Sequence, residues 1–376
     1  MGYVMKTTRG WGSPSRYIQG PGEINNLVKY TDMYGKKVMA IIDPFFYKSL
    51  SEKLEVQYKE NGSELLTYQF DREVTLQRIE AACKAAEEFK PTVVVGIGGG
   101  KTLDTAKAVA DHYNAVMVIV PTSASTDAPT SALSVCYKEN GEHSHAIFYN
   151  KNPELVLADS EIIAKAPIRF LVSGMGDALS TVFEARANQA SDTANYIWFT
   201  AGGFRRCKSS LAVAELCYET VISKGRQAKL AAEKGLVTEA LEDIIEANTL
   251  MSGLGFENTG CAGAHSVGDG ITALPVGAKT LHGEKVAFGV ICELVAENAP
   301  EELIKEVAEF CLDVGLPITL EDLYVDPTPE NIEIIAQCSL NSFWNAEPFN
   351  VTVDMAKTII LAGNAVGHMY KEQYKK

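Results

Sequence analysis

The chain has 376 residues, 46% of them hydrophobic and 22% charged, a composition typical of a folded globular protein with about two domains. Because 48 acidic residues oppose 34 basic ones, giving a formal net charge of −14, we expect no nucleic-acid partner and no binding to an anionic membrane surface. The apolar runs are too short for a membrane-spanning helix, and the first residues lack the apolar core of a signal peptide. These features together predict a cytoplasmic protein.

Short apolar runs in residues 1–166 predict the strands of a parallel sheet. The runs are continuous and rich in β-branched residues, as expected for strands that are buried on both faces. The expected strands are 38–43, 65–70, 92–96 and 116–120, with helices at 74–90 and 101–113. A hairpin is expected at 131–137 and 145–149, and an edge strand at 155–158. Strand and helix alternate here, which predicts an α/β domain over residues 1–166.

Beyond Pro167 the pattern changes to long amphipathic segments, and strand-like alternation nearly disappears. The expected helices are 177–188, 209–223, 237–253, 282–298, 301–314 and 352–371. We therefore expect an all-α second domain over residues 167–376. Two domains of different class leave a cleft between them, which is a common place for a small-molecule site.

The segment VVVGIGGGKTLDTAKAVA, residues 93–110, joins an apolar strand to a helix through Gly98, Gly99 and Gly100. Glycines let a ligand approach the backbone, and the free amides at a helix N-terminus suit a pyrophosphate. The spacing fits neither the P-loop nor the GxGxxG dinucleotide motif. A tight strand-to-helix turn without a ligand is the alternative, but the triple glycine favours anion binding.

Small polar residues follow the next strand in PTSASTDAPTSALSV, residues 121–135. Ligands of open α/β sheets bind beyond the carboxyl ends of the strands, so Thr122 and Ser125 are candidates for phosphate or ribose contacts, with Asp127 beside them. Asp43 ends the first predicted strand, where a carboxylate can accept from both ribose hydroxyls and would favour NAD over NADP. The alternatives are a flexible linker for the polar segment and a turn-forming aspartate before Pro44.

Candidate metal ligands must come mainly from the six histidines, because the eight cysteines form no CxxC pair and are interpreted as buried hydrophobic residues. His265 and His282 lie among small residues in or beside predicted helices, and Asp177 opens an otherwise apolar helix. An aspartate at a helix N-terminus is usually a cap, so spacing alone gives only weak support for a metal site.

Taken in order, GIGGGKTLDTAKA, PTSASTDAPTSALSV, GMGDALSTVFEAR, AGAHSVGDG and LHGEKVAFG resemble the glycerol dehydrogenases, in the polyol branch of the iron-containing (group III) alcohol dehydrogenases. The resemblance covers nearly the whole chain, from about Tyr17 to Pro317. It implies the architecture shared with dehydroquinate synthase, with an α/β NAD-binding domain and a helical metal- and substrate-binding domain. It also implies a homo-oligomer, commonly an octamer.

The resemblance assigns roles to individual residues. Asp177, His265 and His282 match the family's zinc ligands, and Asp127 matches an acid near the nicotinamide and the polyol. Iron-using relatives carry a further histidine where this chain has Thr181, so we expect Zn²⁺ in preference to Fe²⁺. The implied NAD-binding positions are Asp43 (on the ribose), Gly98, Gly99, Gly100, Lys101, Asp104, Thr122, Ser125, Ser131, Leu133 and Tyr137.

The chain departs from the family pattern in three stretches. The usual HAxHNG reads HSVGDG from His265, so a second histidine is replaced by Gly268. The stretch ENTGCAGAH replaces ESGGLAAAH, and residues 342–352, SFWNAEPFNVT, do not follow the usual IxNMP-like stretch. These departures concern the identity of the substrate rather than the cofactor or the metal.

The function that we expect is the zinc-dependent, NAD-linked oxidation of a small vicinal diol, most simply glycerol, to the hydroxyketone dihydroxyacetone. Zinc would act as a Lewis acid that lowers the pKa of the reacting alcohol, and hydride would pass to the nicotinamide. The alternatives are a dehydrogenase of 1,2-propanediol or 2,3-butanediol, a lyase similar to dehydroquinate synthase, and a protein that binds NAD without catalysis.

Overall fold

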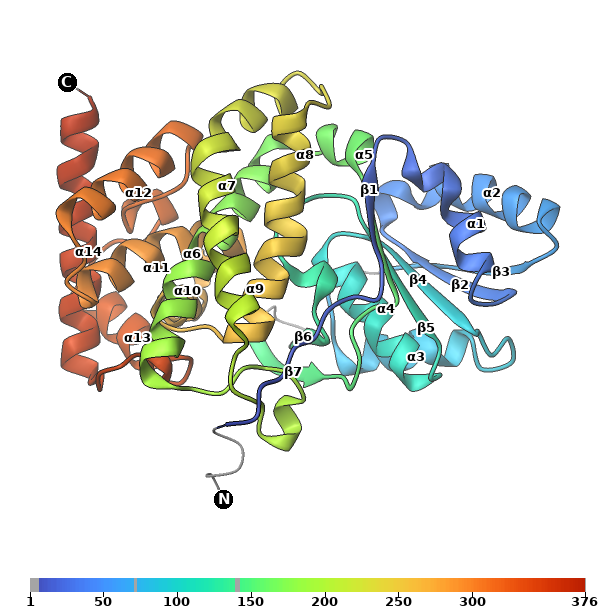
Figure 1. The fold of residues 1–376 in the computed structure, drawn as a ribbon, viewed down its shortest axis with the longest axis horizontal. Helices are drawn as coiled ribbons and strands as arrows, with labels where there is room; N and C mark the ends of the chain where they lie inside the picture. Colours follow the sequence, from blue (N-terminus) through green and yellow to red (C-terminus); the bar gives the residue numbers. More distant parts are fainter. Residues whose placement is uncertain (1–6, 71–72, 139–142, 376) are drawn as a thin grey trace.

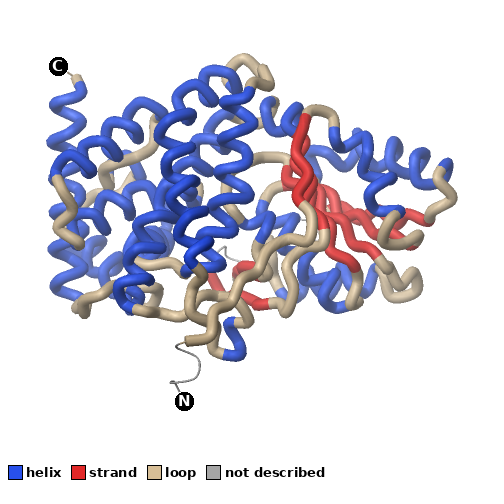
Figure 2. Tube along the Cα trace, in the orientation of Figure 1, coloured by secondary structure: helices blue, strands red, loops and turns tan. Residues whose placement is uncertain are grey.

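The computed structural model describes residues 7–70, 73–138 and 143–375. Figure 1 shows an α/β part, built from the N-terminal residues, beside a helical part that extends to the C-terminus. The strands gather in the first part, and helices make up almost all of the second (Figure 2). The predicted division into an α/β fold followed by a helical fold is therefore confirmed.

The central sheet is parallel, with the strand order β1-β8-β5-β4-β2-β3. Its strands are β1 (Tyr17–Gly20), β2 (Lys37–Ile42), β3 (Glu64–Gln69), β4 (Val93–Gly98), β5 (Val116–Pro121) and β8 (Leu155–Asp159). A separate antiparallel hairpin pairs β6 (Leu133–Tyr137) with β7 (His143–Phe148). The runs predicted from continuous apolar sequence thus form the middle of the sheet.

The prediction of an edge strand at residues 155–158 was wrong. β8 lies inside the sheet between β1 and β5, and the N-terminal strand β1 is the edge. The burial pattern explains the difference, because Leu155, Val156, Leu157 and Ala158 are all almost fully buried. The β1 sequence YIQG is too short and too mixed to be predicted as a strand, and forms one by pairing with β8.

Helices cover both faces of the sheet because successive residues of each strand point to opposite sides. In β2, Val38 belongs to a cluster with residues of α1 and α2, whereas its neighbour Met39 packs with residues of α3 and α4. The helices of this part are α1 (Leu27–Asp32), α2 (Pro44–Glu60), α3 (Leu76–Ala85), α4 (Gly100–His112) and α5 (Ser160–Ala164). The sheet therefore has a core on each side.

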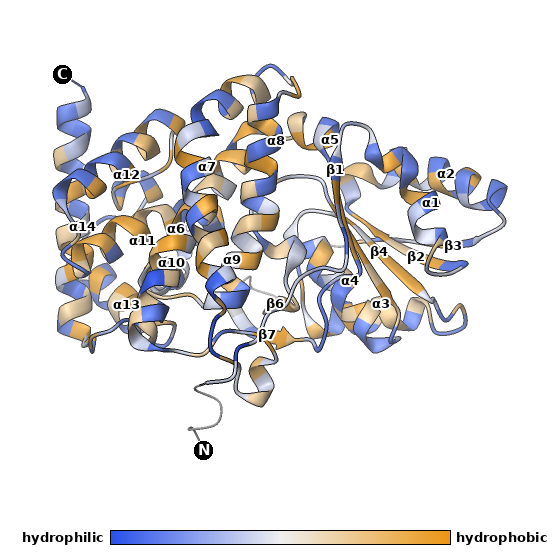
Figure 3. Ribbon diagram, in the orientation of Figure 1, coloured by the Kyte–Doolittle hydropathy of each residue, from blue (hydrophilic) through white to orange (hydrophobic). Residues whose placement is uncertain are grey.

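The helical part is organised around α6, which begins directly after Pro167 and is buried along most of its length. The hydrophobic residues of its helices turn inward (Figure 3). Its helices are α6 (Ile168–Ser191), α7 (Lys208–Ala232), α8 (Glu239–Glu246), α9 (Ser252–Thr259), α10 (Gly263–Thr272), α11 (His282–Ala296), α12 (Glu301–Val314), α13 (Pro329–Ser339) and α14 (Val353–Tyr374).

Several details of this part differ from the sequence predictions: α6 begins at residue 168 rather than 177, and neither α10 nor α13 was predicted. The segment 237–253 is not a single helix, because a π-helical turn at Ala247–Met251 joins α8 to α9. α10 was not predicted as a separate helix, since its sequence GAHSVGDGIT is rich in glycine. Within the described part of the chain, no helix combines the length and apolar character needed to span a bilayer.

Candidate active site

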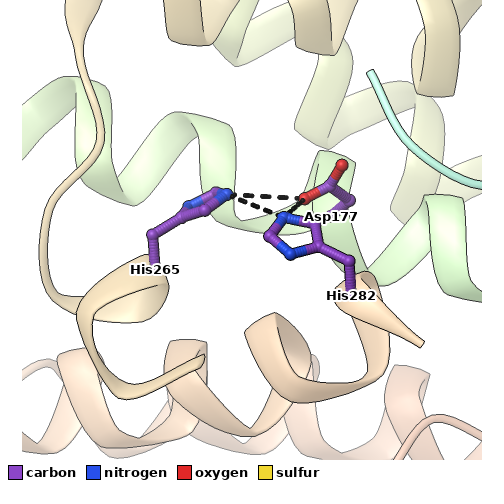
Figure 4. A group of neighbouring side chains, drawn as sticks. All are labelled: Asp177, His265 and His282. Carbon is purple, nitrogen blue, oxygen red and sulfur yellow. Dashed lines mark hydrogen bonds and ion pairs between the residues drawn. The ribbon is translucent and has the colours of Figure 1, made fainter. Parts of the chain in front are cut away.

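Asp177, His265 and His282 meet at one point in the helical part, although they come from three helices (Figure 4). Asp177 Oδ1 lies 3.1 Å from His282 Nε2 and 3.5 Å from His265 Nε2. The two Nε2 atoms are 3.3 Å apart. One carboxylate and two imidazoles that present their donor atoms to a common point form a donor set that suits a transition metal such as zinc.

Glycines at the helix crossings bring these ligands together. A Cβ at residue 176 would lie 2.3 Å from the Gly283 carbonyl oxygen, and a Cβ at residue 283 would lie 1.8 Å from the Ser173 carbonyl oxygen. α6 and α11 can therefore approach closely only because both positions lack a side chain. This contact places Asp177, next to Gly176, against His282, the first residue of α11.

Asp177 does not cap a helix. Helix capping was the alternative role that made spacing alone weak support for a metal site. Asp177 lies within α6 and is almost fully buried, and Oδ1 has no hydrogen-bond donor among the described residues. Burial opposes ionisation, but the imidazoles of His282 and His265 hold the pKa of Asp177 well below its usual range. A buried carboxylate oxygen that faces only two ring nitrogens is well suited to a cation.

Glu184 is a site residue that sequence reasoning missed. Its Oε2 lies 2.7 Å from Nδ1 of His265, and its Oε1 accepts hydrogen bonds from the backbone amides of Ala262 and His265. A proton on Nδ1 leaves Nε2 as the lone-pair donor that faces Asp177. Glu184 follows Asp177 by two turns of α6, and this spacing was the available sequence signal.

Asp127 lies beside the candidate metal ligands Asp177, His265 and His282, which are called the metal-ligand cluster below. Its backbone amide donates to Asp177 Oδ2 at 3.2 Å, and its Oδ2 accepts from the Ser252 hydroxyl at 2.8 Å. Burial and the nearby Asp177 carboxylate raise the pKa of Asp127. The polar segment after β5 is therefore no loose linker, because it joins the α/β part to the metal-ligand cluster.

The glycine segment forms an open cradle between β4 and α4. Gly99 is the N-cap of α4 and makes no side-chain cap, and a Cβ on Gly99 would meet nothing within 4 Å. At Gly98, in contrast, a Cβ would lie 2.7 Å from the Thr102 side chain and 2.9 Å from Asp43 Cβ. The space beside Gly99 is thus open, which leaves room for a ligand at the N-terminus of α4.

Of the residues expected on the nucleotide side, Asp43 and Thr122 lie beside the glycine segment, whereas Ser125 contacts α6. Asp43 caps α2, with Oδ1 accepting from Phe45 N, and its Oδ2 lies 3.5 Å from the Thr102 hydroxyl. One carboxylate oxygen of Asp43 therefore caps α2, while the other lies near the glycine segment. Thr122 donates its amide to Gly98 O at 3.0 Å, and the Ser125 carbonyl accepts from Ser173 Oγ at 3.3 Å.

A fully buried lysine, Lys107, holds the other expected cofactor positions in place. Its Nζ donates to the carbonyls of Ala128 and Leu133 and to Ser131 Oγ, and it lies 3.4 Å from Asp104 Oδ1. Asp104 is itself buried and accepts from Val135 N at 3.0 Å. The contacts of Asp104 and Ser131 are therefore with the protein, and they shape the segment that follows β5.

Lys101 and Tyr137 lie together at the outer edge of the cradle. Lys101 Nζ is 5.3 Å from the centroid of the Tyr137 ring and forms an ion pair with Glu73 at 2.5 Å. The Lys101 side chain is about half exposed, so this ion pair is weak and the ammonium group can turn toward a phosphate.

Known proteins share both the sequence and the fold of this chain. The sequence model of the iron-containing alcohol dehydrogenases matches residues 14–160. Glycerol dehydrogenase of Thermotoga maritima is 44% identical over 363 residues (95% of this chain and 97% of that protein), and glycerol dehydrogenase of Citrobacter freundii is 41% identical over 361 residues (95% and 98%).

The structural comparison gives the same answer. The crystal structure of a probable glycerol dehydrogenase from Sinorhizobium meliloti 1021 has a TM-score of 0.90 at 43% identity, with 96% of this chain and 99% of that chain covered. The predicted fold class is therefore confirmed. The chain belongs to the iron-containing alcohol dehydrogenase family, within its glycerol dehydrogenase group, and is an NAD-dependent alcohol dehydrogenase.

Proposed function

We propose that the protein is a zinc-dependent dehydrogenase that interconverts glycerol, or a similar small vicinal diol, and the corresponding hydroxyketone with NAD as hydride acceptor. The observation that carries this proposal is the convergence of Asp177 Oδ1, His265 Nε2 and His282 Nε2, all within 3.5 Å of one another. The glycerol dehydrogenases similar to this chain support the choice of substrate class.

The donor set supports zinc as the metal. Asp177, His265 and His282 would hold it, and the site would keep positions open for substrate. Thr181, where iron-using relatives carry a histidine, directs its hydroxyl to Ser252 Oγ at 3.0 Å rather than to the cluster. When bound, the metal supplies Lewis acidity that lowers the pKa of the reacting alcohol.

The protein's own residues orient the two reactants. The glycine cradle and the N-terminal amides of α4 would hold the pyrophosphate of NAD, and Asp43 would accept from the ribose hydroxyls. Asp127 is held by Ser252 and would accept a hydrogen bond from a substrate hydroxyl. This arrangement would bring the substrate carbon and the nicotinamide to the same side of the metal-ligand cluster.

The substrate proton would leave to water. The His282 side chain is 41% exposed although the neighbouring Asp177 carboxylate is fully buried, so solvent reaches one side of the cluster. No further side-chain base is then required.

The test is NADH formation by zinc-reconstituted protein with glycerol, 1,2-propanediol and 2,3-butanediol, each against a chelated control. Chelator-sensitive turnover that is highest on glycerol supports the proposal. Highest turnover on another diol would keep the chemistry and change the substrate. A protein that binds zinc and NAD but transfers no hydride with any of the three would contradict it.

A histidine substitution distinguishes loss of a metal ligand from a general loss of folding. His282→Ala should abolish bound zinc and turnover together. His368→Ala is the matched control, since His368 lies on α14 and its ring pairs with Glu321 at 3.0 Å. Full activity of a zinc-free His282→Ala variant would refute the assignment of the ligands.

A further inference from the structure

A second group of carboxylates lies behind the N-terminus of α10, apart from the three residues of the proposed zinc site. It consists of Glu293 in α11, Glu297 at the end of the same helix, and Glu347 in the segment before α14. One oxygen from each lies within 4.8 Å of the others. Glu293 is fully buried and Glu347 is 4% exposed, so these are not solvated surface acids.

Two of the stretches that depart from the family pattern meet at this point. Gly263, in ENTGCAGAH, donates its amide to Glu347 Oε1 at 3.0 Å, and Glu347 belongs to SFWNAEPFNVT. A Cβ at residue 263 would lie 2.8 Å from that same oxygen and 2.9 Å from the Trp344 ring. The glycine therefore makes room for the carboxylate, so the two departures depend on each other.

Backbone amides satisfy only part of this group. Gly263 N uses one oxygen of Glu347, and Ala264 N donates to Glu293 Oε2 at 3.0 Å. The remaining oxygens, Glu293 Oε1 and Glu347 Oε2, are buried and have no hydrogen-bond partner among the described residues. Buried carboxylate oxygens without a donor or a cation are strongly destabilising, so this group needs either shared protons or a bound cation.

The surrounding residues add negative charge to this group rather than neutralise it. Burial and the neighbouring carboxylates raise the pKa of Glu293. The same causes raise the pKa of Glu347 to about 8. The Glu184 carboxylate, which contacts His265, also raises the pKa of Glu293 through its negative charge. The positive charge of Arg186 partly offsets the rise that burial causes in the pKa of Glu297. Its guanidinium group, however, also donates a hydrogen bond to Glu215 at 3.1 Å.

We propose that Glu293, Glu297 and Glu347 bind a hard divalent cation of the Mg²⁺, Mn²⁺ or Ca²⁺ class. The donors are carboxylate oxygens alone, which such cations prefer over the nitrogen-rich set that suits zinc. Glu347 also lines a cavity of about 690 Å³ together with Asn345 and Asn350, so this end of the group lies beside solvent-accessible space. The bound cation ties α11 and the segment before α14 to the N-terminus of α10.

A cation bound to these glutamates would also affect α10, the helix that carries His265. α10 and α11 pack side by side (Figure 1), and the two carboxylates that bond Gly263 and Ala264 act directly before that histidine. A cation at this place thus neutralises the group that holds the first turn of α10. It stabilises the placement of His265 without touching substrate or NAD.

The experiment counts Mn²⁺ bound to zinc-saturated protein from the electron paramagnetic resonance signal of the free ion. We expect one additional Mn²⁺ per chain, with the apparent affinity at least 10-fold weaker in Glu347→Gln and in Glu297→Gln. The glutamine at 347 can still accept from Gly263 N and can donate to Glu293, so that variant should fold. Glu297 is only half-buried and provides an independent variant.

Two controls separate this site from others. Glu302→Gln, on the exposed start of α12, should leave Mn²⁺ binding unchanged. His282→Ala should also retain the additional Mn²⁺, so the result does not depend on the proposed catalytic function. Mn²⁺ should raise the thermal unfolding midpoint of the wild type but not of Glu347→Gln.

Three results would overturn the proposal. The first is no additional Mn²⁺ at millimolar concentration, which would mean that the carboxyl groups share protons instead. The second is unchanged binding in both glutamate variants. The third is loss of the Mn²⁺ in His282→Ala with retention in Glu347→Gln, which would place the ion at the histidines.

Discussion

The most informative perturbation of the metal-ligand cluster is Glu184→Gln, because it changes one hydrogen bond of the carboxylate and keeps its shape. Glu184 accepts from Ala262 N at 2.8 Å, from His265 N at 2.9 Å, and from His265 Nδ1 at 2.7 Å. Glutamine retains a carbonyl oxygen for the two backbone amides. Its NH₂ group, however, cannot accept the proton of Nδ1.

The expected magnitude follows from the loss of this one charge-assisted hydrogen bond. Such a bond contributes about 1.5–3 kcal/mol, which corresponds to roughly a 10- to 100-fold change in an equilibrium constant. The same range is typical when the partner of a metal-bound histidine is removed. Zinc affinity should therefore fall about 10- to 100-fold, measured by competition with a chromophoric chelator.

The control is Thr181→Val, a buried change on the same helix. The Thr181 hydroxyl bonds Ser252 Oγ and not the cluster, so zinc affinity should stay within about threefold of the wild type. The stability of the metal-free proteins is measured in parallel. If Glu184→Gln lowers that stability while zinc affinity is unchanged, Glu184 only caps α10, and the reasoning about the tautomer of His265 is refuted.

Three further predictions concern the cofactor side and pH. Gly99→Ala should weaken NADH binding at least about 10-fold in a fluorescence titration while stability stays within about 0.5 kcal/mol, because the new methyl meets no protein atom and enters the open cradle; unchanged NADH affinity would contradict the assignment. Lys107→Met should cost about 3–5 kcal/mol in urea unfolding, since Asp104 is left buried without its cation, and adding Asp104→Asn should restore part of the loss. Burial raises the pKa of Glu257 from 4.5 to about 7, so its contribution to stability is complete below about pH 4.5 and is lost as the pH rises through 7. Unfolding at pH 5 and pH 8 should then show a loss of up to about 3 kcal/mol that is smaller in Glu257→Gln, and an equal loss in both proteins would refute this.

Local sequence was enough to predict the middle of the sheet, the glycine segment and most helices of the second part. The β2, β4 and β5 runs are almost continuously apolar, as expected for parallel strands that are covered on both faces. Amphipathic spacing likewise predicted α12 at residues 301–314 as the structure has it. In both cases the hydrophobic pattern of residues close together in the sequence is enough to predict the element.

The metal-ligand cluster was predicted from the order of five motifs, because spacing alone did not separate Asp177 from a helix cap. The structure supplies the physical reason that the sequence lacks. Asp177 and His282 meet where Gly176 and Gly283 let two helices touch, and a contact between residues so far apart leaves no local pattern.

Long-range contacts also decided the parts that sequence reasoning did not reach. β8 became an interior strand only because the short β1 pairs outside it. The partners of buried polar groups, Glu184 for His265 and Glu347 for the amide of Gly263, come from distant segments. Hydrophobic periodicity predicts which face of an element is buried, whereas a buried polar group needs one specific partner in space, and only the tertiary structure supplies it.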